Sequence, residues 1–208
     1  MKNLGIKQRT NRTACILAAL FLLIAIPVLG GCGSQEPESA VEETAAPEET
    51  TQAAVSDGEN LRHFSAKEFD GGRFTEEELA EKDLTIISVW STAESGSVNE
   101  LWELAAIEEQ LMDNVRLAVY CEDGSDKKDR AEDLLQQAGF GGTALYKATG
   151  DLKAVLGGIE EYPTALFFDS EGSQIGEPLI GVPEDTGQTY REKINQCLGD
   201  MGKGMIGP

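Results

Sequence analysis

Three short runs of apolar, β-forming residues constrain the fold of this chain more than any other feature of its sequence. They are Leu84–Trp90 (LTIISVW), Val115–Cys121 and Ala165–Phe168. Continuous apolar runs of roughly four to eight residues are typical of strands that are buried on both faces of a sheet. We therefore expect an α/β domain in which helices cover both faces of the sheet.

Amphipathic helices are predicted between and after these strands. Apolar residues recur at steps of three and four in Ser97–Met112, and Asp129–Ala138 is a second such segment that Gly139 ends. A shorter helix is expected near Asp151–Leu156 and a final one over Asp185–Leu198. Because a helix that connects two neighbouring strands makes a right-handed crossover, the first strands are predicted to be parallel.

The last pair of strands is expected to be antiparallel. Asp169–Gly172 (DSEG) is a tight-turn signal that directly follows Ala165–Phe168, and Gln174–Ile180 is predicted to pair back along that strand. The sheet is therefore predicted to be mixed, with helices on both faces.

The segments outside these runs carry weaker signals. Asp70–Gly72 is a turn signal inside a phenylalanine-rich stretch and predicts a short hairpin. Thr75, followed by Glu78 three residues later, predicts a helix that begins with a capping box. Gly139–Gly142 (GFGG) is interpreted as a linker within a glycine-rich loop.

The first 31 residues have the pattern of a targeting segment. Four basic residues and no acidic ones precede an apolar stretch, Ala14–Leu29, which is shorter than the roughly 20 residues of a membrane-spanning helix. The stretch ends in Leu29-Gly30-Gly31-Cys32, which resembles the bacterial lipobox, whose cysteine becomes the lipid-modified first residue of the mature protein. We expect lipid on Cys32 and anchoring to the extracytoplasmic face of the cell membrane. An ordinary secretory signal with a chance cysteine is the alternative.

A polar, acidic segment follows Cys32. Residues 33–60 contain eight acidic residues and no lysine or arginine, and they include too few apolar side chains to build a core. The sequence therefore predicts a signal peptide at 1–31, a lipid-anchored disordered linker at 32–60, a folded domain at 61–199 and a flexible tail at 200–208.

The large negative net charge of the chain excludes some classes of binding partner. The formal net charge is −20, and it is −24 once residues 1–31 are removed with their four basic side chains. Such a chain repels the phosphate backbone of nucleic acids and anionic lipid headgroups, so nucleic acid is excluded as a partner.

Three further stretches resemble motifs of one bacterial protein family. Val89–Thr92 (VWST) resembles a strand end usually written Phe-Trp-Ala-Thr, and Asn99–Leu104 (NELWEL) resembles the helix that follows it. Tyr162–Asp169 (YPTALFFD) resembles a segment with a cis-proline before a strand. Together they make the region from Phe64 to Leu198 similar to the membrane-anchored TlpA/ResA-type thiol-disulfide proteins. The resemblance implies a thioredoxin-like fold and a binding loop at Tyr162, Pro163 and Thr164.

The chain departs from this family at its active-site motif. The Cys-x-x-Cys pair of the family falls on positions 94 to 97, where this chain has Glu94-Ser95-Gly96-Ser97. Thiol–disulfide exchange needs one thiolate that attacks a disulfide and a second thiol that resolves the mixed disulfide. Neither serine nor glutamate can replace them, so no catalytic residue is assigned at this degenerate motif.

Two interpretations of the degenerate motif remain open. In the structural one, Ser97 and Glu100 form a capping box, and Glu94 is an anion near the positive end of a helix. In the functional one, Glu94 and Ser97 contact a ligand or peptide beside an exposed groove at Pro163. Serine hydrolysis is disfavoured, because the only histidine, His63, lies at the start of the domain and is expected to be an ordinary surface residue.

The remaining cysteines are not expected to replace the missing pair. Cys121 ends a predicted strand at the same end of the sheet as position 94, whereas Cys197 lies near the far end of the last helix, about 20 Å away at 1.5 Å per residue. A disulfide needs Cα atoms within roughly 7 Å, so no intramolecular bond between them is expected. Cys121 is interpreted as a small buried apolar residue, with a reactive thiol as the alternative.

The sequence leaves three functions open. The first is a redox-inactive binding or accessory module for an envelope protein or peptide. The second is an enzyme, either a thiol-disulfide-related protein that acts through Cys121 or a partner's thiols or one with a different chemistry at Glu94, and the third is a passive acidic spacer protein. No metal site or cofactor is implied, because one histidine and isolated cysteines do not make a ligand set. The sequence does not indicate an oligomeric state.

Overall fold

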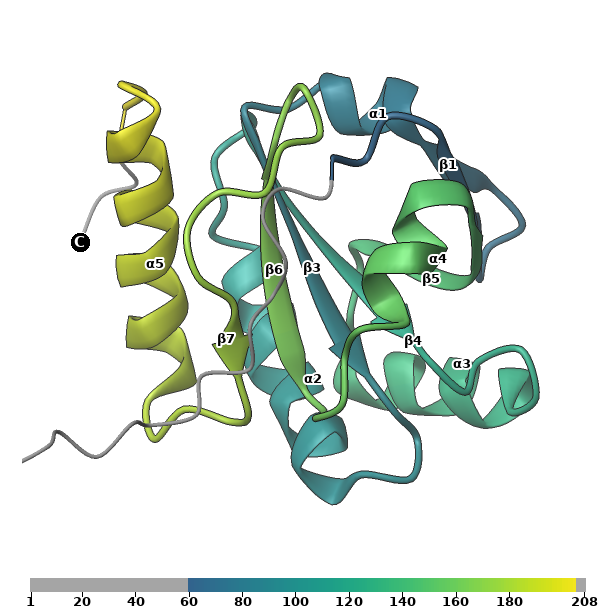
Figure 1. The fold of residues 1–208 in the computed structure, drawn as a ribbon. Helices are drawn as coiled ribbons and strands as arrows, with labels where there is room; N and C mark the ends of the chain where they lie inside the picture. Colours follow the sequence, from purple (N-terminus) through teal and green to yellow (C-terminus); the bar gives the residue numbers. More distant parts are fainter. Residues whose placement is uncertain (1–59, 205–208) are drawn as a thin grey trace, which may run out of the picture. The chain divides into compact units, whose positions relative to one another are not determined.

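A computed structural model describes residues 60–204, which contain a seven-stranded sheet and five helices (Figure 1). The predicted signal peptide at 1–31 and the predicted linker up to residue 59 lie outside the described residues, as does the end of the predicted tail, 205–208. The strands are β1 Phe64–Glu68, β2 Arg73–Thr75, β3 Leu84–Trp90, β4 Val115–Cys121, β5 Thr143–Thr149, β6 Thr164–Asp169 and β7 Leu179–Ile180. The helices are α1 Glu76–Ala80, α2 Ser95–Glu108, α3 Lys128–Ala138, α4 Gly150–Leu156 and α5 Thr186–Asp200.

The sheet is mixed, as the sequence predicts. Its order is β2-β1-β5-β4-β3-β6-β7. The strands β3, β4 and β5 are parallel to one another, and all other neighbours are antiparallel. The three apolar runs form the three adjacent central strands, with Val89 of β3 paired both to Tyr120 of β4 and to Thr164 of β6.

Helices cover both faces of this sheet. Side chains alternate along β3, so that Leu84, Ile86 and Trp90 face one layer while Ile87 and Val89 face the other. The first core cluster joins one face of the sheet to α2, α3 and α5, and the second joins the opposite face to α1 and α4. The prediction of a mixed sheet between two helical layers is therefore confirmed.

Two predictions concern the segment before β3. Thr75 caps α1 with the reciprocal hydrogen bonds of a capping box to Glu78, as predicted. The predicted hairpin is formed by β1 and β2, but β1 also pairs with β5, so the hairpin is part of the main sheet.

The largest error of the sequence interpretation concerns β5. Thr143–Thr149 was expected to be part of a glycine-rich loop, whereas it pairs in parallel with β4 and antiparallel with β1. The reason is its burial pattern: Leu145 and Ala148 are buried but the residues beside them are partly or fully exposed, so no continuous apolar run marks this strand. Gly139 ends α3, as predicted, in the left-handed conformation with φ +71°.

The predicted strand Gln174–Ile180 is mostly absent. A single bridge joins Gln174 to Phe168, and regular pairing with β6 is restricted to Leu179–Ile180. Between them, Gly176 has φ +66° and Pro178 lacks a backbone N–H, so the chain leaves the ladder.

Different segments of the chain meet at the two ends of the sheet. The α2 pole is the end at which β3 and β4 finish and β6 begins; it contains residues 91–103, 121–126, 157–164 and 180–186 and lies at the lower side of Figure 1. At the opposite end, the N–H of Leu61 donates to the carbonyl of Gly172 at 2.8 Å. The described part of the chain therefore begins at the end of the sheet opposite the α2 pole.

Within residues 60–204 no helix combines the length and the apolar character needed to span a membrane. Of the predicted tail 200–208, the structure describes 200–204, in which the Lys203 Nζ lies 2.8 Å from the Asp83 Oδ1 and the Lys203 N–H donates to the Leu198 carbonyl.

Candidate functional site

The connection from β3 to α2 is held by the loop that follows β4. The Thr92 N–H and hydroxyl donate to the two carboxylate oxygens of Asp123 at 2.9 and 2.6 Å, and the Glu122 N–H donates to the Trp90 carbonyl. Burial raises the pKa of the Asp123 carboxyl, but the hydrogen bonds that this carboxyl accepts from Thr92 outweigh burial, so its pKa is lowered. The start of α2 is therefore fixed to the adjacent parallel strand.

The four residues of the degenerate motif form the first turn of α2. Glu94 is the N-cap residue, its side chain makes no capping hydrogen bond, and its carbonyl accepts from the Val98 N–H at 3.0 Å. Glu94 and Ser95 are exposed, whereas Ser97 is buried. The Ser97 Oγ is one of the buried side-chain atoms within residues 60–204 that have no hydrogen-bond partner.

The predicted capping box between Ser97 and Glu100 is wrong. The helix begins two residues earlier than expected, so Ser97 lies in its first turn instead of preceding it. Glu100 is 2% exposed and points into the domain, where its carboxyl accepts from the Tyr190 hydroxyl at 3.2 Å and from the Ser88 hydroxyl at 3.4 Å.

Glu100 is the functional candidate that the sequence interpretation missed. Burial raises the pKa of its carboxyl to about 7, and the hydrogen bonds from Tyr190 and Ser88 oppose this shift only in part. A signal was available in the sequence: Glu100 stands three residues after Ser97 and four before Leu104, so it falls on the buried face of the helix.

The predicted cis-proline loop lies next to the first turn of α2. The Tyr162–Pro163 peptide bond is cis, the Pro163 carbonyl accepts from the Gly181 N–H at 2.8 Å, and Thr164 pairs with Val89 of β3. A Cβ placed on Gly96 would lie 3.3 Å from the Val182 side chain, so the segment after β7 flanks the same turn.

The expected exposed groove beside Pro163 needs correction. Pro163 itself is buried and Tyr162 is half-buried. The accessible surface at this place is made instead by Ala93–Ser95 and by the exposed side chains of Ile180 and Val182. Burial, together with the nearby Glu122 and Asp123, raises the pKa of the Tyr162 hydroxyl.

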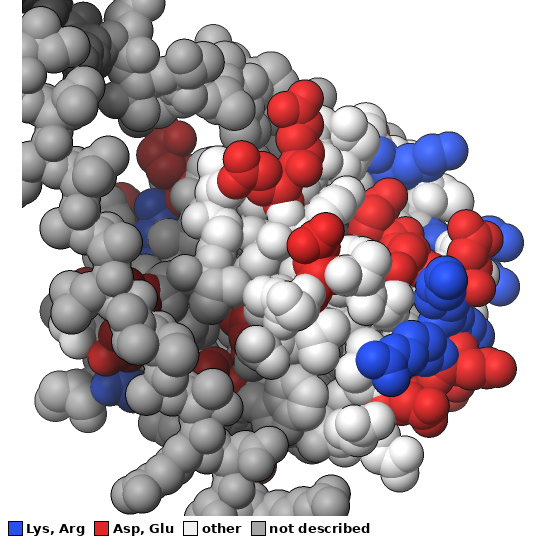
Figure 2. Space-filling view, turned by 90° about the horizontal axis from the view of Figure 1, so that it is seen from below, with Lys and Arg blue, Asp and Glu red and all other residues white. Residues whose placement is uncertain are grey.

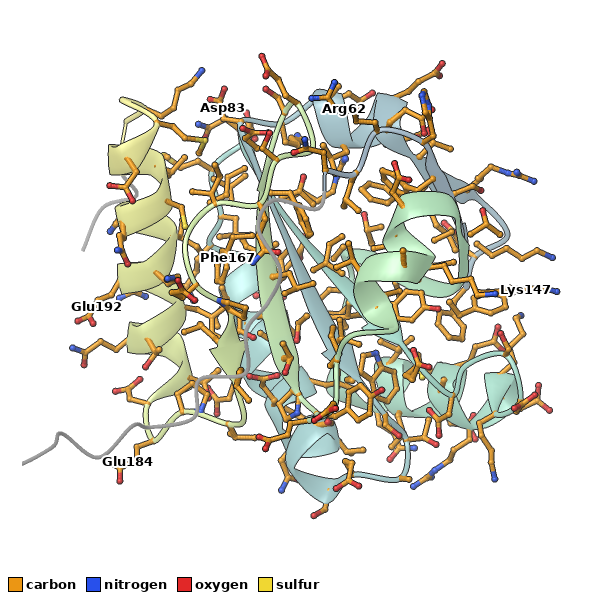
Figure 3. All side chains as sticks on the ribbon, in the orientation of Figure 1. Arg62, Asp83, Lys147, Phe167, Glu184 and Glu192 are labelled. Carbon is orange, nitrogen blue, oxygen red and sulfur yellow. The ribbon has the colours of Figure 1, made fainter. Side chains whose placement is uncertain are left out.

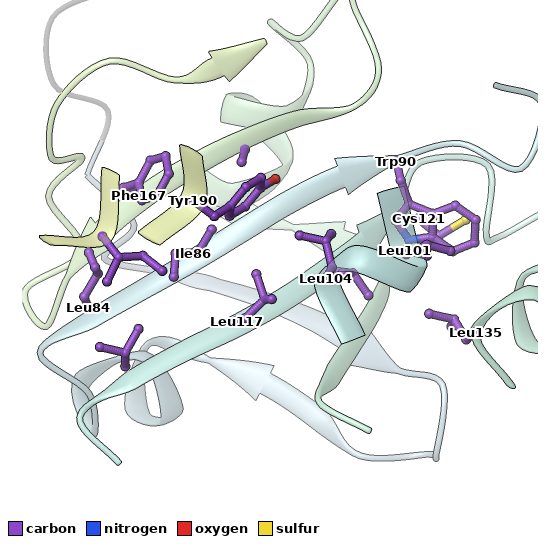
Figure 4. Close-up of a cluster of buried hydrophobic side chains, with 14 of the residues drawn as sticks. Leu84, Ile86, Trp90, Leu101, Leu104, Leu117, Cys121, Leu135, Phe167 and Tyr190 are labelled. Carbon is purple, nitrogen blue, oxygen red and sulfur yellow. The ribbon is translucent and has the colours of Figure 1, made fainter. Parts of the chain in front are cut away.

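Both cysteines of the described region are free and buried. Cys121 packs beside Trp90 in the first core cluster (Figure 4), and its Sγ lies 3.3 Å from the Asp123 Oδ1. The Cys197 Sγ lies in α5, 3.8 Å from the Ile175 carbonyl oxygen. Burial raises the pKa of both thiols, and for Cys121 the Asp123 carboxylate raises it further.

The remaining predicted features do not add chemistry to this pole. His63 is exposed at the other end of the sheet, where its Nδ1 lies 3.7 Å from the Glu76 carboxylate. Residues 60–204 contain no group of three or more His, Cys, Asp or Glu side chains arranged to hold a metal ion.

Comparison with solved structures identifies the fold. No protein-family model and no curated protein matches the sequence. A thioredoxin-family thiol:disulfide interchange protein from Chlorobium tepidum aligns with a TM-score of 0.57 and 16% identity, over 70% of this chain and 100% of its own. StoA from Bacillus subtilis aligns with a TM-score of 0.52 and 18% identity, over 64% and 97%. A secreted Mycobacterium tuberculosis disulfide oxidoreductase homologous to E. coli DsbE gives 0.51 and 14%, over 62% and 92%. The described part of this chain therefore has a thioredoxin-like fold.

Proposed function

We propose that this chain is an exported, lipid-anchored thioredoxin-like protein that binds a polypeptide partner at its α2 pole and performs no thiol–disulfide exchange there. The observation that carries the proposal is a surface made by the exposed Glu94 and Ser95 at the start of α2 and by the segment bonded to the Pro163 carbonyl, with no sulfur at positions 94 to 97. The fold of the redox proteins is present without the atoms that carry their chemistry.

The properties of the two remaining thiols support redox inactivity. A reactive cysteine is accessible and has a lowered pKa, usually beside a cation or at a helix N-terminus. Cys121 and Cys197 are 0% and 1% exposed, and burial raises the pKa of each. The Cys121 sulfur lies 3.3 Å from the Asp123 carboxylate, an anion that disfavours the thiolate.

The described chain begins at the end of the sheet opposite the α2 pole. This arrangement supports a binding site at the α2 pole that stays accessible when the protein is anchored. Leu61 is attached next to Gly172, at the end of the sheet opposite the α2 pole. Figure 3 shows Arg62 and Asp83 at this upper end and Glu184, a residue of the α2 pole, at the lower end. A lipid on Cys32 would therefore be attached through the end of the domain that is distant from the proposed binding surface.

Residue-resolved alkylation tests whether a thiol of this domain reacts in the native state. Treating the native full chain with iodoacetamide and mapping peptides by mass spectrometry should label neither Cys121 nor Cys197, whereas both should be labelled in denaturant. Rapid native labelling of Cys121 alone would contradict the proposal and favour the alternative, in which this thiol exchanges with partner disulfides.

The lipid anchor has its own test. Cells that produce the chain and are fed a labelled fatty acid should incorporate the label into the wild-type protein and not into Cys32→Ser. Incorporation that persists in Cys32→Ser would show that position 32 is not the acylated residue.

A further inference from the structure

The α2 pole has an unusual distribution of charge. Its four segments come from distant parts of the sequence and meet because β3 and β4 end where β6 begins. Together they contain ten acidic residues and no lysine or arginine. The acidic residues are Glu94, Glu100, Glu103, Glu122, Asp123, Asp126, Glu160, Glu161, Glu184 and Asp185. None of the ion pairs found within residues 60–204 lies at this pole.

Exposed apolar side chains lie within this acidic surface. All three large hydrophobic residues of the described region that are exposed belong to the α2 pole: Trp102 at 42%, Ile180 at 54% and Val182 at 47%. Ile180 and Val182 flank Gly181, whose N–H donates to the Pro163 carbonyl. Figure 2 shows the molecule from the lower side of Figure 1: acidic side chains lie above and to the right of an uncharged area, and most of the basic side chains in view lie toward the right edge.

A cleft adjoins the apolar residues. It has a volume of about 370 Å³ and lies between α2 and the segment that leads into α5. Val182 forms part of its wall, and Glu103, Glu184 and Asp185 supply charged groups to it, without any basic residue in the lining. Anionic groups near an apolar wall favour a side chain that has an aliphatic stem and a cationic end.

We propose that the α2 pole selects polypeptide segments in which lysine or arginine alternates with apolar residues. The cationic side chain occupies the cleft beside Glu103, Glu184 and Asp185, and the apolar side chain packs on Ile180 and Val182. This inference rests on the proposed binding function and specifies the chemistry of its partner. Charge complementarity of this kind sets the choice of partner and the rate of association.

Fluorescence anisotropy with designed peptides tests the proposal. The probe is a fluorescein-labelled peptide in which lysine alternates with leucine, and the comparison peptides carry glutamate in place of lysine or serine in place of leucine. The full chain should bind the lysine–leucine peptide most tightly, and binding should weaken as salt is added.

Matched variants locate the binding surface. Neutralising Glu103→Gln, Glu184→Gln and Asp185→Asn together should weaken binding roughly tenfold, while Asn at 185 keeps the N-cap of α5. The control neutralises the same number of exposed acids outside the α2 pole, with Glu77→Gln, Asp113→Asn and Glu171→Gln, and should change affinity less than about twofold. Val182→Ser should weaken binding of the lysine–leucine peptide and not of the lysine–serine peptide.

The outcomes separate this inference from the function on which it rests. Equal weakening by both triple variants, or absence of binding of the lysine–leucine peptide, overturns the inference. Binding of the glutamate–leucine peptide that Val182→Ser abolishes also overturns it, but leaves the binding function standing. No binding of any peptide, together with native reactivity of Cys121, overturns both.

Discussion

Replacing Glu94 and Ser97 together by cysteine should give the chain a thiol–disulfide exchange activity. Position 94 is the exposed N-cap of α2 and position 97 the buried third residue of its first turn. A helix N-terminus stabilises a thiolate, and lowering a thiol pKa by one unit near neutral pH raises the reactive fraction about tenfold. We expect Glu94→Cys/Ser97→Cys to reduce insulin with dithiothreitol at about ten times the background rate or more.

The structure favours folding of this double variant. The Ser97 Oγ has no hydrogen bond to lose within the described region, and sulfur is less costly to bury than an unpaired hydroxyl. The controls are Glu94→Cys and Ser97→Cys alone, which should stay near background because one thiol cannot both attack a disulfide and resolve the product. A double variant that forms the 94–97 disulfide but reduces no insulin would show that a cysteine pair at the start of α2 is not sufficient for exchange.

Glu100→Gln should stabilise the folded chain at alkaline pH and not at acidic pH. The carboxyl has a pKa of about 7 in the folded state and an ordinary value of 4.5 when unfolded. Both states are protonated below pH 4.5, so burial then carries no charge penalty; above pH 7 the folded state holds a buried carboxylate. The wild type therefore loses up to about 3 kcal/mol of stability as the pH rises from 4.5 through 7. The glutamine variant should lack this loss.

Urea denaturation at pH 5 and at pH 8 measures this difference. The free energy of unfolding of Glu100→Gln, minus that of the wild type, should be larger at pH 8 than at pH 5 by about 2 kcal/mol or more. The matched control is Glu103→Gln, three residues further along α2 but exposed, which should show no comparable pH dependence. A difference between Glu100→Gln and wild type that is the same at both pH values would contradict the burial and pairing of this carboxyl.

The sequence predicted those strands that are buried on both faces, because such strands appear in the sequence as continuous apolar runs. The strands β3, β4 and β6 were predicted because they are buried on both faces, and the layer order followed from the helices between them. The strand β5 was not predicted, because only part of each of its faces is buried and its pairing with β1 joins residues more than 75 positions apart. Such pairing depends on tertiary contacts that no local pattern encodes.

The candidate site was predictable in location and not in detail. The spacing from Trp90 placed positions 94 to 97 at a helix start, where the structure has them. The inward orientation of Glu100 depends on Tyr190, which stands 90 residues away on α5. The acidic α2 pole likewise arises only when four separate segments are brought together by the strand order.

Insulin reduction by the wild-type full chain, measured beside the double-cysteine variant, tests whether this domain performs thiol–disulfide exchange. We predict a wild-type rate equal to that of dithiothreitol alone and unchanged by Cys121→Ser. A wild-type rate above that background, abolished by Cys121→Ser, would show that the domain exchanges disulfides through this thiol.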